Sequence, residues 1–249
     1  MQQSAKCLIF DADDTLWENN IYFEAAIEDF LELTSSLYGP RNSAAPGPSA
    51  VLDLLNQIES ESIPQWGYGS RHFVNSLRET FRRVFRGSED GEGNEEPYLS
   101  AIGRIGERLF HHPINIMPEV SSTLEALRDR YRLMLFTKGD YEEQSSKVSR
   151  SGLEEHFDRI EIVREKDTGA YHDLVLRHSL HCHSTFMVGN SPRSDVLPAL
   201  EAGLWAIFVP HAHTWKLEHE DLDPHPRLLT AQSLGELPAL LAQVFPSEF

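Results

Sequence analysis

Long apolar runs, basic residues and cysteines are all scarce in this sequence of 249 residues. No apolar run approaches the roughly 20 residues that a membrane-spanning helix needs, so we expect no membrane partner. Lysine and arginine total 22 against 39 aspartates and glutamates, and the formal net charge of −17 disfavours nucleic acid as a partner. The two cysteines, Cys7 and Cys182, form no metal-binding or disulfide pattern, so we expect a reducing, cytoplasmic location.

The segment from residue 18 to residue 113 has helical periodicity. Two stretches, 39–50 and 87–97, are rich in small, polar or acidic residues and are predicted to be loops. Around them, apolar residues recur at the spacing of one helix face. Four such stripes begin at Phe23, Val51, Phe73 and Leu99. We therefore predict four helices and no strand in this segment.

From Pro118 onwards, apolar runs with the character of strands alternate with helical patterns. Regular alternation of strand and helix predicts a parallel sheet with helices on both faces. The fold class is therefore α/β: a Rossmann-like core of residues 1–17 and 114–249, interrupted by an all-helical domain of residues 18–113. The predicted strands of the core are residues 7–10, 133–136, 159–163, 185–188, 205–209 and 227–229.

Polar side chains follow the carboxyl ends of the predicted strands, which is where open parallel sheets bind ligands. The first strand ends in three carboxylates within four residues, and such crowding is costly unless positive charge lies among them. We expect the strand-end residues to converge on one site. They are Asp11, Asp13, Thr137, Lys138, Lys166, Asn190 and Asp195.

In this order, the strand-end residues resemble the four motifs of the haloacid dehalogenase-like superfamily. The closest likeness is to its phosphatases with a helical cap inserted after the first motif. The segments that carry the resemblance are LIFDADDT, LMLFT, a lone Lys166 and GNSPRSD. The resemblance covers nearly the whole chain. It implies a hydrolase that uses Mg²⁺ to dephosphorylate a small phosphorylated metabolite through an aspartyl-phosphate, as a monomer or a homodimer.

The resemblance also implies catalytic and metal-binding roles. Asp11 would attack phosphorus, and Asp13 would protonate the leaving group and later deprotonate water. Mg²⁺ prefers oxygen ligands, which Asp11, the backbone carbonyl of Asp13, Asn190 and Asp195 would supply. Asn190 departs from the family pattern, because an uncharged amide stands where the family has an acid. We expect a lower affinity for the metal in consequence.

Phosphate binding is assigned by the same resemblance to Thr137, Lys138 and Lys166. Lys166 is the best match to the lone lysine of the third motif, with Lys147 and Lys138 as competing candidates. Lys138 is itself a departure, because the family often has asparagine after the hydroxyl residue. A lysine there either adds positive charge for the substrate or is simply solvated.

Several alternatives stay open on the sequence alone. Asp13 favours phosphoryl transfer over dehalogenation, but it does not separate a hydrolase from a phosphomutase. Asn190 leaves room for a non-catalytic phosphate-binding module. A phospho-accepting module is disfavoured by the long helical insert. Within that insert, Tyr68 and Arg71 lie where flanking glycines allow a substrate-selecting loop, and a plain turn between helices explains the pattern equally well.

Overall fold

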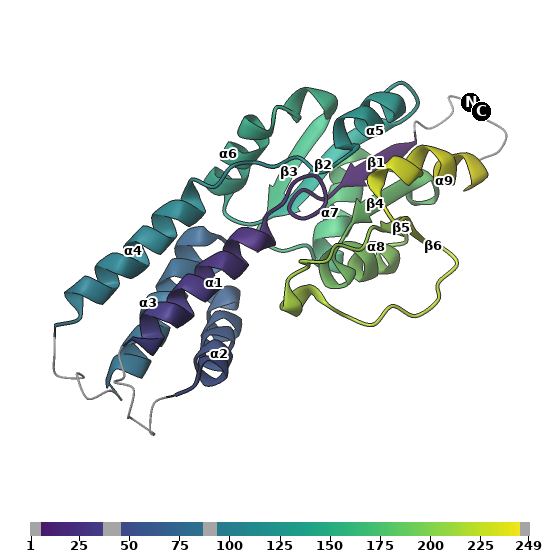
Figure 1. The fold of residues 1–249 in the computed structure, drawn as a ribbon. Helices are drawn as coiled ribbons and strands as arrows, with labels where there is room; N and C mark the ends of the chain where they lie inside the picture. Colours follow the sequence, from purple (N-terminus) through teal and green to yellow (C-terminus); the bar gives the residue numbers. More distant parts are fainter. Residues whose placement is uncertain (1–5, 37–45, 87–93, 245–249) are drawn as a thin grey trace. The chain divides into compact units, whose positions relative to one another are not determined.

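The chain divides into two compact units (Figure 1). One comprises Met1–Asn20 with Ile114–Phe249, and the other comprises Ile21–Pro113. This computed structural model describes residues 6–36, 46–86 and 94–244. The predicted loops 39–50 and 87–97 lie largely outside the described residues, and their described ends at 48–50 and 96–97 are helical. That the helical unit acts as a substrate cap stays a prediction.

The first unit is built on a six-stranded parallel sheet in the order β3-β2-β1-β4-β5-β6 (Figure 1). The strand order reverses at β1, which pairs with β2 on one side and β4 on the other. A ligand crevice is expected at the carboxyl ends of the strands next to this reversal. The predicted α/β fold is confirmed. The strands are β1 (Cys7–Phe10), β2 (Arg132–Lys138), β3 (Arg159–Val163), β4 (Thr185–Gly189), β5 (Trp205–Phe208) and β6 (Leu228–Thr230).

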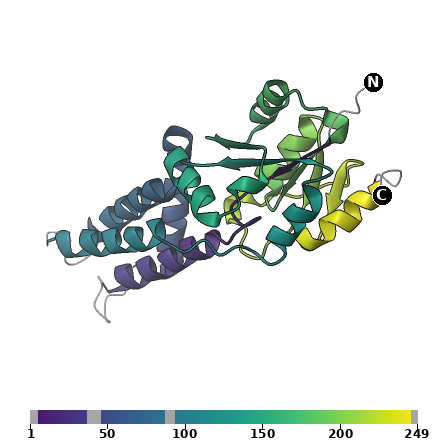
Figure 2. The same cartoon turned by 90° about the horizontal axis from the view of Figure 1, so that it is seen from above.

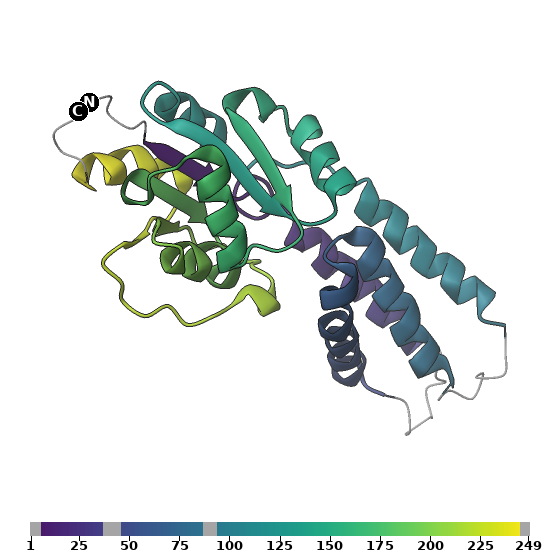
Figure 3. The same ribbon diagram turned by 180° about the vertical axis from the view of Figure 1, so that it is seen from behind.

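Neighbouring side chains of a strand point to opposite faces of the sheet, and in β1 both sets are apolar. Helices therefore cover both faces. In β1, Leu8 and Phe10 belong to one apolar cluster and Cys7 and Ile9 to another. The first cluster includes residues of α5 (Val120–Leu127), α6 (Tyr141–Ser151) and α9 (Leu237–Val244). The second includes residues of α7 (Thr168–His178) and α8 (Leu197–Glu201). Figure 2 shows the yellow helix α9 on one side of the strands and the green helix α7 on the other, and Figure 3 shows the α7 side from behind.

The second unit contains the four predicted helices and has an apolar core of its own. In that core Phe81 lies against Phe85 and Tyr98, with ring centroids 5.2 and 5.4 Å away. Among the described residues, no helix combines the length and apolar character needed to cross a bilayer. The helices are α1 (Asn20–Ser35), α2 (Pro48–Trp66), α3 (Ser70–Arg86) and α4 (Glu96–Phe110).

Two leucines of α7 offer a matched test of how the sheet is covered. Leu174 is 1% exposed and packs in the α7–α8 cluster, whereas Leu176 is 77% exposed. We expect Leu174→Ala to lower the free energy of unfolding by about 2–5 kcal/mol, because it leaves a cavity under the helix. Leu176→Ala should change it by less than about 0.5 kcal/mol. Urea denaturation of both variants measures the difference, and equal losses would contradict this packing.

Candidate active site at the carboxyl ends of the strands

The chain turns sharply where β1 ends. The amide of Asp11 still donates to the carbonyl of Val188 at 2.9 Å, so this residue extends the β1–β4 ladder by one step. The amide of Leu16 then folds back to the carbonyl of Ala12 at 2.8 Å. Asp14 takes a left-handed backbone conformation, with φ of 61°, which aspartate tolerates better than most residues. The turn sends the neighbouring carboxylates to different partners.

The ammonium group of Lys166 lies between two buried carboxylates. It donates to Oδ1 of Asp11 at 2.5 Å and also to Oδ1 of Asp195. A third, longer contact of 3.4 Å joins it to the carbonyl of Phe136 in β2. Lys166 is 3% exposed, so solvent contributes little to balancing these charges. Three residues from three separate loops, all predicted from the sequence, therefore meet here.

The charges of this cluster do not balance. Burial and the neighbouring Asp195 raise the pKa of Asp11 to about 7, although Lys166 acts in the opposite direction. Burial also works against the charge of Lys166, but Asp11 and Asp195 outweigh it and raise the pKa of the ammonium above its usual value. One positive charge thus faces two carboxylates in a dry environment. The cluster can take up either a proton or a further cation.

Asp195 is held in place by the loop after β4. That loop forms a single π-helical turn over Pro192–Val196. The amide of Ser191 donates to Oδ2 of Asp195 at 2.9 Å, and its hydroxyl accepts from the amide of Ser194 at 2.9 Å. Glycine is needed at position 189, at the end of β4, because a Cβ there would collide with the Asp195 carboxylate. These contacts hold the carboxylate of Asp195 in place, where it contacts Lys166.

Asp13 has a cation of its own, Lys147 of α6. Oδ2 of Asp13 accepts from Lys147 Nζ at 2.9 Å and from Gln144 Nε2 at 2.8 Å. Oδ1 accepts from the indole of Trp17 at 2.7 Å. Burial would raise the pKa of Asp13, but Lys147 and these hydrogen bonds outweigh it and lower the pKa. Lys147, a competing candidate for the third motif on sequence grounds, therefore pairs with Asp13 and not with Asp11.

Asn190 sits in a hydrogen-bond network that uses both ends of its amide. Its Oδ1 accepts from the hydroxyl of Thr15 at 3.1 Å, and its Nδ2 donates to the hydroxyl oxygen of Thr214 at 2.9 Å. Thr214 already gives its single hydroxyl hydrogen to the carbonyl of His211 at 3.0 Å. A carboxylate at position 190 could accept from Thr214 only if that hydroxyl gave up its contact with the carbonyl of His211. The contact with Thr214 accounts for asparagine at a position where the family has an acid.

Lys138 belongs to a second buried ion pair. Its ammonium donates to Oε1 of Glu218 at 2.6 Å and to the hydroxyl of Ser194 at 2.7 Å. The other Glu218 oxygen accepts from the hydroxyls of Ser191 and Ser194, both at 2.5 Å. Burial opposes ionisation of Glu218, but Lys138 and the hydroxyls outweigh it and lower its pKa. Sequence reasoning missed Glu218, because no motif marks it. Phosphate binding by Lys138 stays a prediction.

The remaining predicted residues lie at the end of β2 and in the helical unit. Thr137 is 1% exposed and directly follows Phe136, whose carbonyl contacts Lys166. Tyr68 lies between two glycines with positive φ, and Arg71 lies in the first turn of α3. The phosphate-binding role of Thr137 and the specificity roles of Tyr68 and Arg71 stay predictions.

Residues 5–203 match the family model of haloacid dehalogenase-like hydrolases. This chain belongs to that family. It is 29% identical to the glyceraldehyde 3-phosphate phosphatase of Methanothermobacter thermautotrophicus over 82% of this chain and 85% of that protein. The pyrimidine 5'-nucleotidase YjjG of Escherichia coli is 26% identical over 95% of this chain and 97% of that protein. A haloacid dehalogenase-like family hydrolase from Xanthomonas campestris has a similar structure, with a TM-score of 0.80, 30% identity and 97% coverage of both chains. The family that the motifs predicted, and a hydrolase activity with it, are confirmed.

The charge imbalance around Lys166 predicts a pH-dependent effect of Asp11→Asn on stability. The pKa of Asp11 rises on folding from 3.8 to about 7, so between these values the folded protein binds more protons than the unfolded chain. Its free energy of unfolding therefore falls as the pH rises through this window. Asparagine removes the titrating group, while Lys166 keeps Asp195 as a partner. Without divalent cations, we expect the variant to be more stable than the parent at about pH 8 and to lose this advantage towards pH 4.

Urea denaturation in EDTA at both pH values measures this difference. Asp129→Asn, at an exposed position of the same unit, controls for the loss of one negative charge. A parent protein as stable as Asp11→Asn at pH 8 would show that Lys166 balances both carboxylates.

Proposed function

We propose that this hydrolase is a phosphomonoesterase that acts on a small phosphorylated metabolite through an aspartyl-phosphate at Asp11. The observation that supports this most strongly is the ammonium of Lys166 between Asp11 and Asp195, at the carboxyl ends of the strands where the sheet order reverses. The two relatives named above, a glyceraldehyde 3-phosphate phosphatase and a pyrimidine 5'-nucleotidase by their names, favour a phosphate ester as substrate.

Two displacements at phosphorus complete the proposed reaction. An ionised carboxylate oxygen of Asp11 attacks phosphorus, and the bond to the ester oxygen breaks as that oxygen takes a proton from Asp13. Water then attacks the same phosphorus and gives a proton back to Asp13. Orthophosphate leaves, and the Asp11 carboxylate is restored. Lys166 favours the ionised form of Asp11 that the first step needs.

The residues around Asp11 fit Mg²⁺ as the cofactor. Asp11 and Asp195 carry two buried charges against one on Lys166, and the available donors are all oxygens, which a hard dication prefers. Asp11, the backbone carbonyl of Asp13, Asn190 and Asp195 would hold the ion. The amide oxygen of Asn190 has a second lone pair beside the one that accepts from Thr15. When bound, Mg²⁺ would neutralise charge on the carboxylates and the phosphoryl oxygens.

Asp13 is arranged for the second step better than for the first. Its lowered pKa keeps it ionised, which suits the base that takes a proton from water. To act as the acid in the first step it must carry a proton, which the contact with Lys147 opposes. We therefore assign Lys147 the role of setting the proton affinity of Asp13. A dehalogenase would need neither Asp13 as an acid nor a metal, so the presence of Asp13 favours phosphoryl transfer.

The nucleophile is tested by Asp11→Asn in an assay with an aryl phosphate and Mg²⁺. We expect kcat to fall by at least about a thousandfold, because an amide oxygen is too weak a nucleophile to form the intermediate. EDTA should abolish activity in the parent, and Mg²⁺ should restore it. Asp129→Asn is the matched control and should keep full activity. Hydrolysis by Asp11→Asn at the parental rate would remove the proposal.

The role of Lys147 is tested by the pH profile of Lys147→Met. Without the ammonium the pKa of Asp13 rises, so the acidic limb of kcat should move to higher pH by about 1–3 units. Lys216→Met, which removes an exposed lysine of the same unit, should leave the profile in place. An unshifted limb in Lys147→Met, with folding intact, would show that Asp13 titrates independently of this contact.

A further inference from the structure

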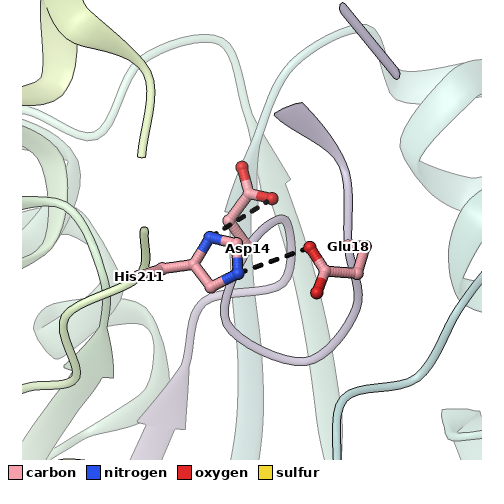
Figure 4. Close-up of side chains that lie close together, drawn as sticks. All are labelled: Asp14, Glu18 and His211. Carbon is pink, nitrogen blue, oxygen red and sulfur yellow. Dashed lines mark ion pairs between the residues drawn. The ribbon is translucent and has the colours of Figure 1, made fainter. Parts of the chain in front are cut away.

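Three further metal-ligating side chains lie together beside the turn that follows β1. They are Asp14 and Glu18 from that turn and His211 from the segment after β5 (Figure 4). Each offers one ligand atom, and these three atoms lie within 4.8 Å of one another. None of the three belongs to the set of residues proposed above to hold Mg²⁺. All three lie in the sheet unit.

The imidazole of His211 lies between the two carboxylates and presents one ring nitrogen to each (Figure 4). Nδ1 is 3.8 Å from Oδ1 of Asp14, which is too long for a hydrogen bond. Nε2 is 3.3 Å from Oε2 of Glu18. Among the described residues, His211 Nδ1 and Glu18 Oε2 are buried atoms with no hydrogen-bond partner. Leaving such an oxygen unpaired is costly, and a cation bound between His211 Nε2 and Glu18 would satisfy Oε2 of Glu18.

The backbone around each ligand is already fixed. Both Asp14 oxygens accept backbone amides at the start of α1, the shortest at 2.8 Å from Asn19, and a carboxylate keeps further lone pairs for a metal. The amide of Glu18 donates to the carbonyl of Asn115 at 3.0 Å. The carbonyl of His211 accepts from the hydroxyl of Thr214 at 3.0 Å. The side chains of Glu18 and His211 are 29% and 17% exposed, so an ion can reach them from solvent.

The donor set discriminates between metals. Mg²⁺ is held by oxygen ligands, whereas a neutral imidazole with carboxylates suits Zn²⁺ and its transition-metal neighbours. Two ligands on one tetrahedral Zn²⁺ with bonds of about 2.0–2.1 Å lie roughly 3.3–3.4 Å apart. The separation of 3.3 Å between His211 Nε2 and Glu18 Oε2 matches this edge.

We propose that Asp14, Glu18 and His211 form a second metal site, which binds Zn²⁺ and differs in position and in ligand chemistry from the Mg²⁺ site around Asp11. The bound ion joins the turn after β1 to the segment after β5, two stretches that are far apart in sequence. Its binding stabilises the folded chain by mass action, because the unfolded chain does not hold the three ligands together.

Calorimetric titration of the full chain with Zn²⁺ tests this site, after treatment with EDTA and in excess Mg²⁺ to occupy the other site. We expect one tight binding event in the parent. Glu18→Gln and His211→Asn should each weaken it by at least about tenfold, because each removes a ligand. The chain has 12 histidines, so adventitious binding must be controlled. His213→Asn is the matched control, since this exposed imidazole lies 5.8 Å from that of His211 and is not in the cluster.

Thermal unfolding supplies a second readout that does not depend on activity. Zn²⁺ should raise the Tm of the parent and of His213→Asn, but not that of Glu18→Gln or His211→Asn. The proposal would be overturned if the parent bound no Zn²⁺, or if the ligand variants bound it as tightly as the parent. The cluster would then be only an ion pair of His211 with its two acids. An equal loss in His213→Asn would also overturn the proposal. Loss of phosphatase activity in Asp11→Asn bears on the proposed function and leaves this result unaffected.

Discussion

One buried ammonium group, that of Lys166, is shared by two carboxylates that come from different strand ends. Asp11 follows β1, which lies in the middle of the sheet. Asp195 follows β4, which pairs directly with β1. Lys166 reaches them from the loop after β3. Burial strengthens every charge interaction in this cluster, and it leaves one carboxylate uncompensated. The uncompensated negative charge would be balanced by a further cation, and this is the physical reason to propose a metal-assisted reaction here.

Two further acids near Asp11 and Asp195 pair with lysines other than Lys166. Asp13 lies two residues from Asp11 in sequence, yet its partner is Lys147 of α6. Glu218 is paired with Lys138, and through two serine hydroxyls it supports the turn that carries Asp195. In a chain with a net charge of −17, three lysines of the sheet unit, Lys138, Lys147 and Lys166, thus lie against acids of the candidate site. The arrangement separates the proton affinities of Asp11 and Asp13: burial and Asp195 raise the pKa of Asp11, whereas Lys147 and hydrogen bonds outweigh burial at Asp13 and lower its pKa.

Much of the fold and part of the candidate site could be predicted from the sequence, because both follow from local patterns. Apolar periodicity located the strands and helices, and strand ends pointed to Asp11, Lys166 and Asp195. The sequence favoured Lys166 among three candidate lysines but could not give the partner of each, because the partners depend on loop geometry that brings Lys166 to Asp11 and Lys147 to Asp13. The partners of Asn190 were hidden as well, since Thr15 and Thr214 lie far from it in sequence. The substrate follows from no local pattern in the sequence.

The central claim, that Asp11 carries the phosphoryl group, is tested most directly by trapping the intermediate. Sodium borohydride reduces an acyl phosphate to an alcohol, so acid-quenched enzyme taken during turnover can be reduced, digested and read by peptide mass spectrometry. The account predicts homoserine at position 11, formed only when both a phosphate ester and Mg²⁺ are present. Turnover that leaves Asp11 unreduced, or reduction at another carboxylate, would contradict it.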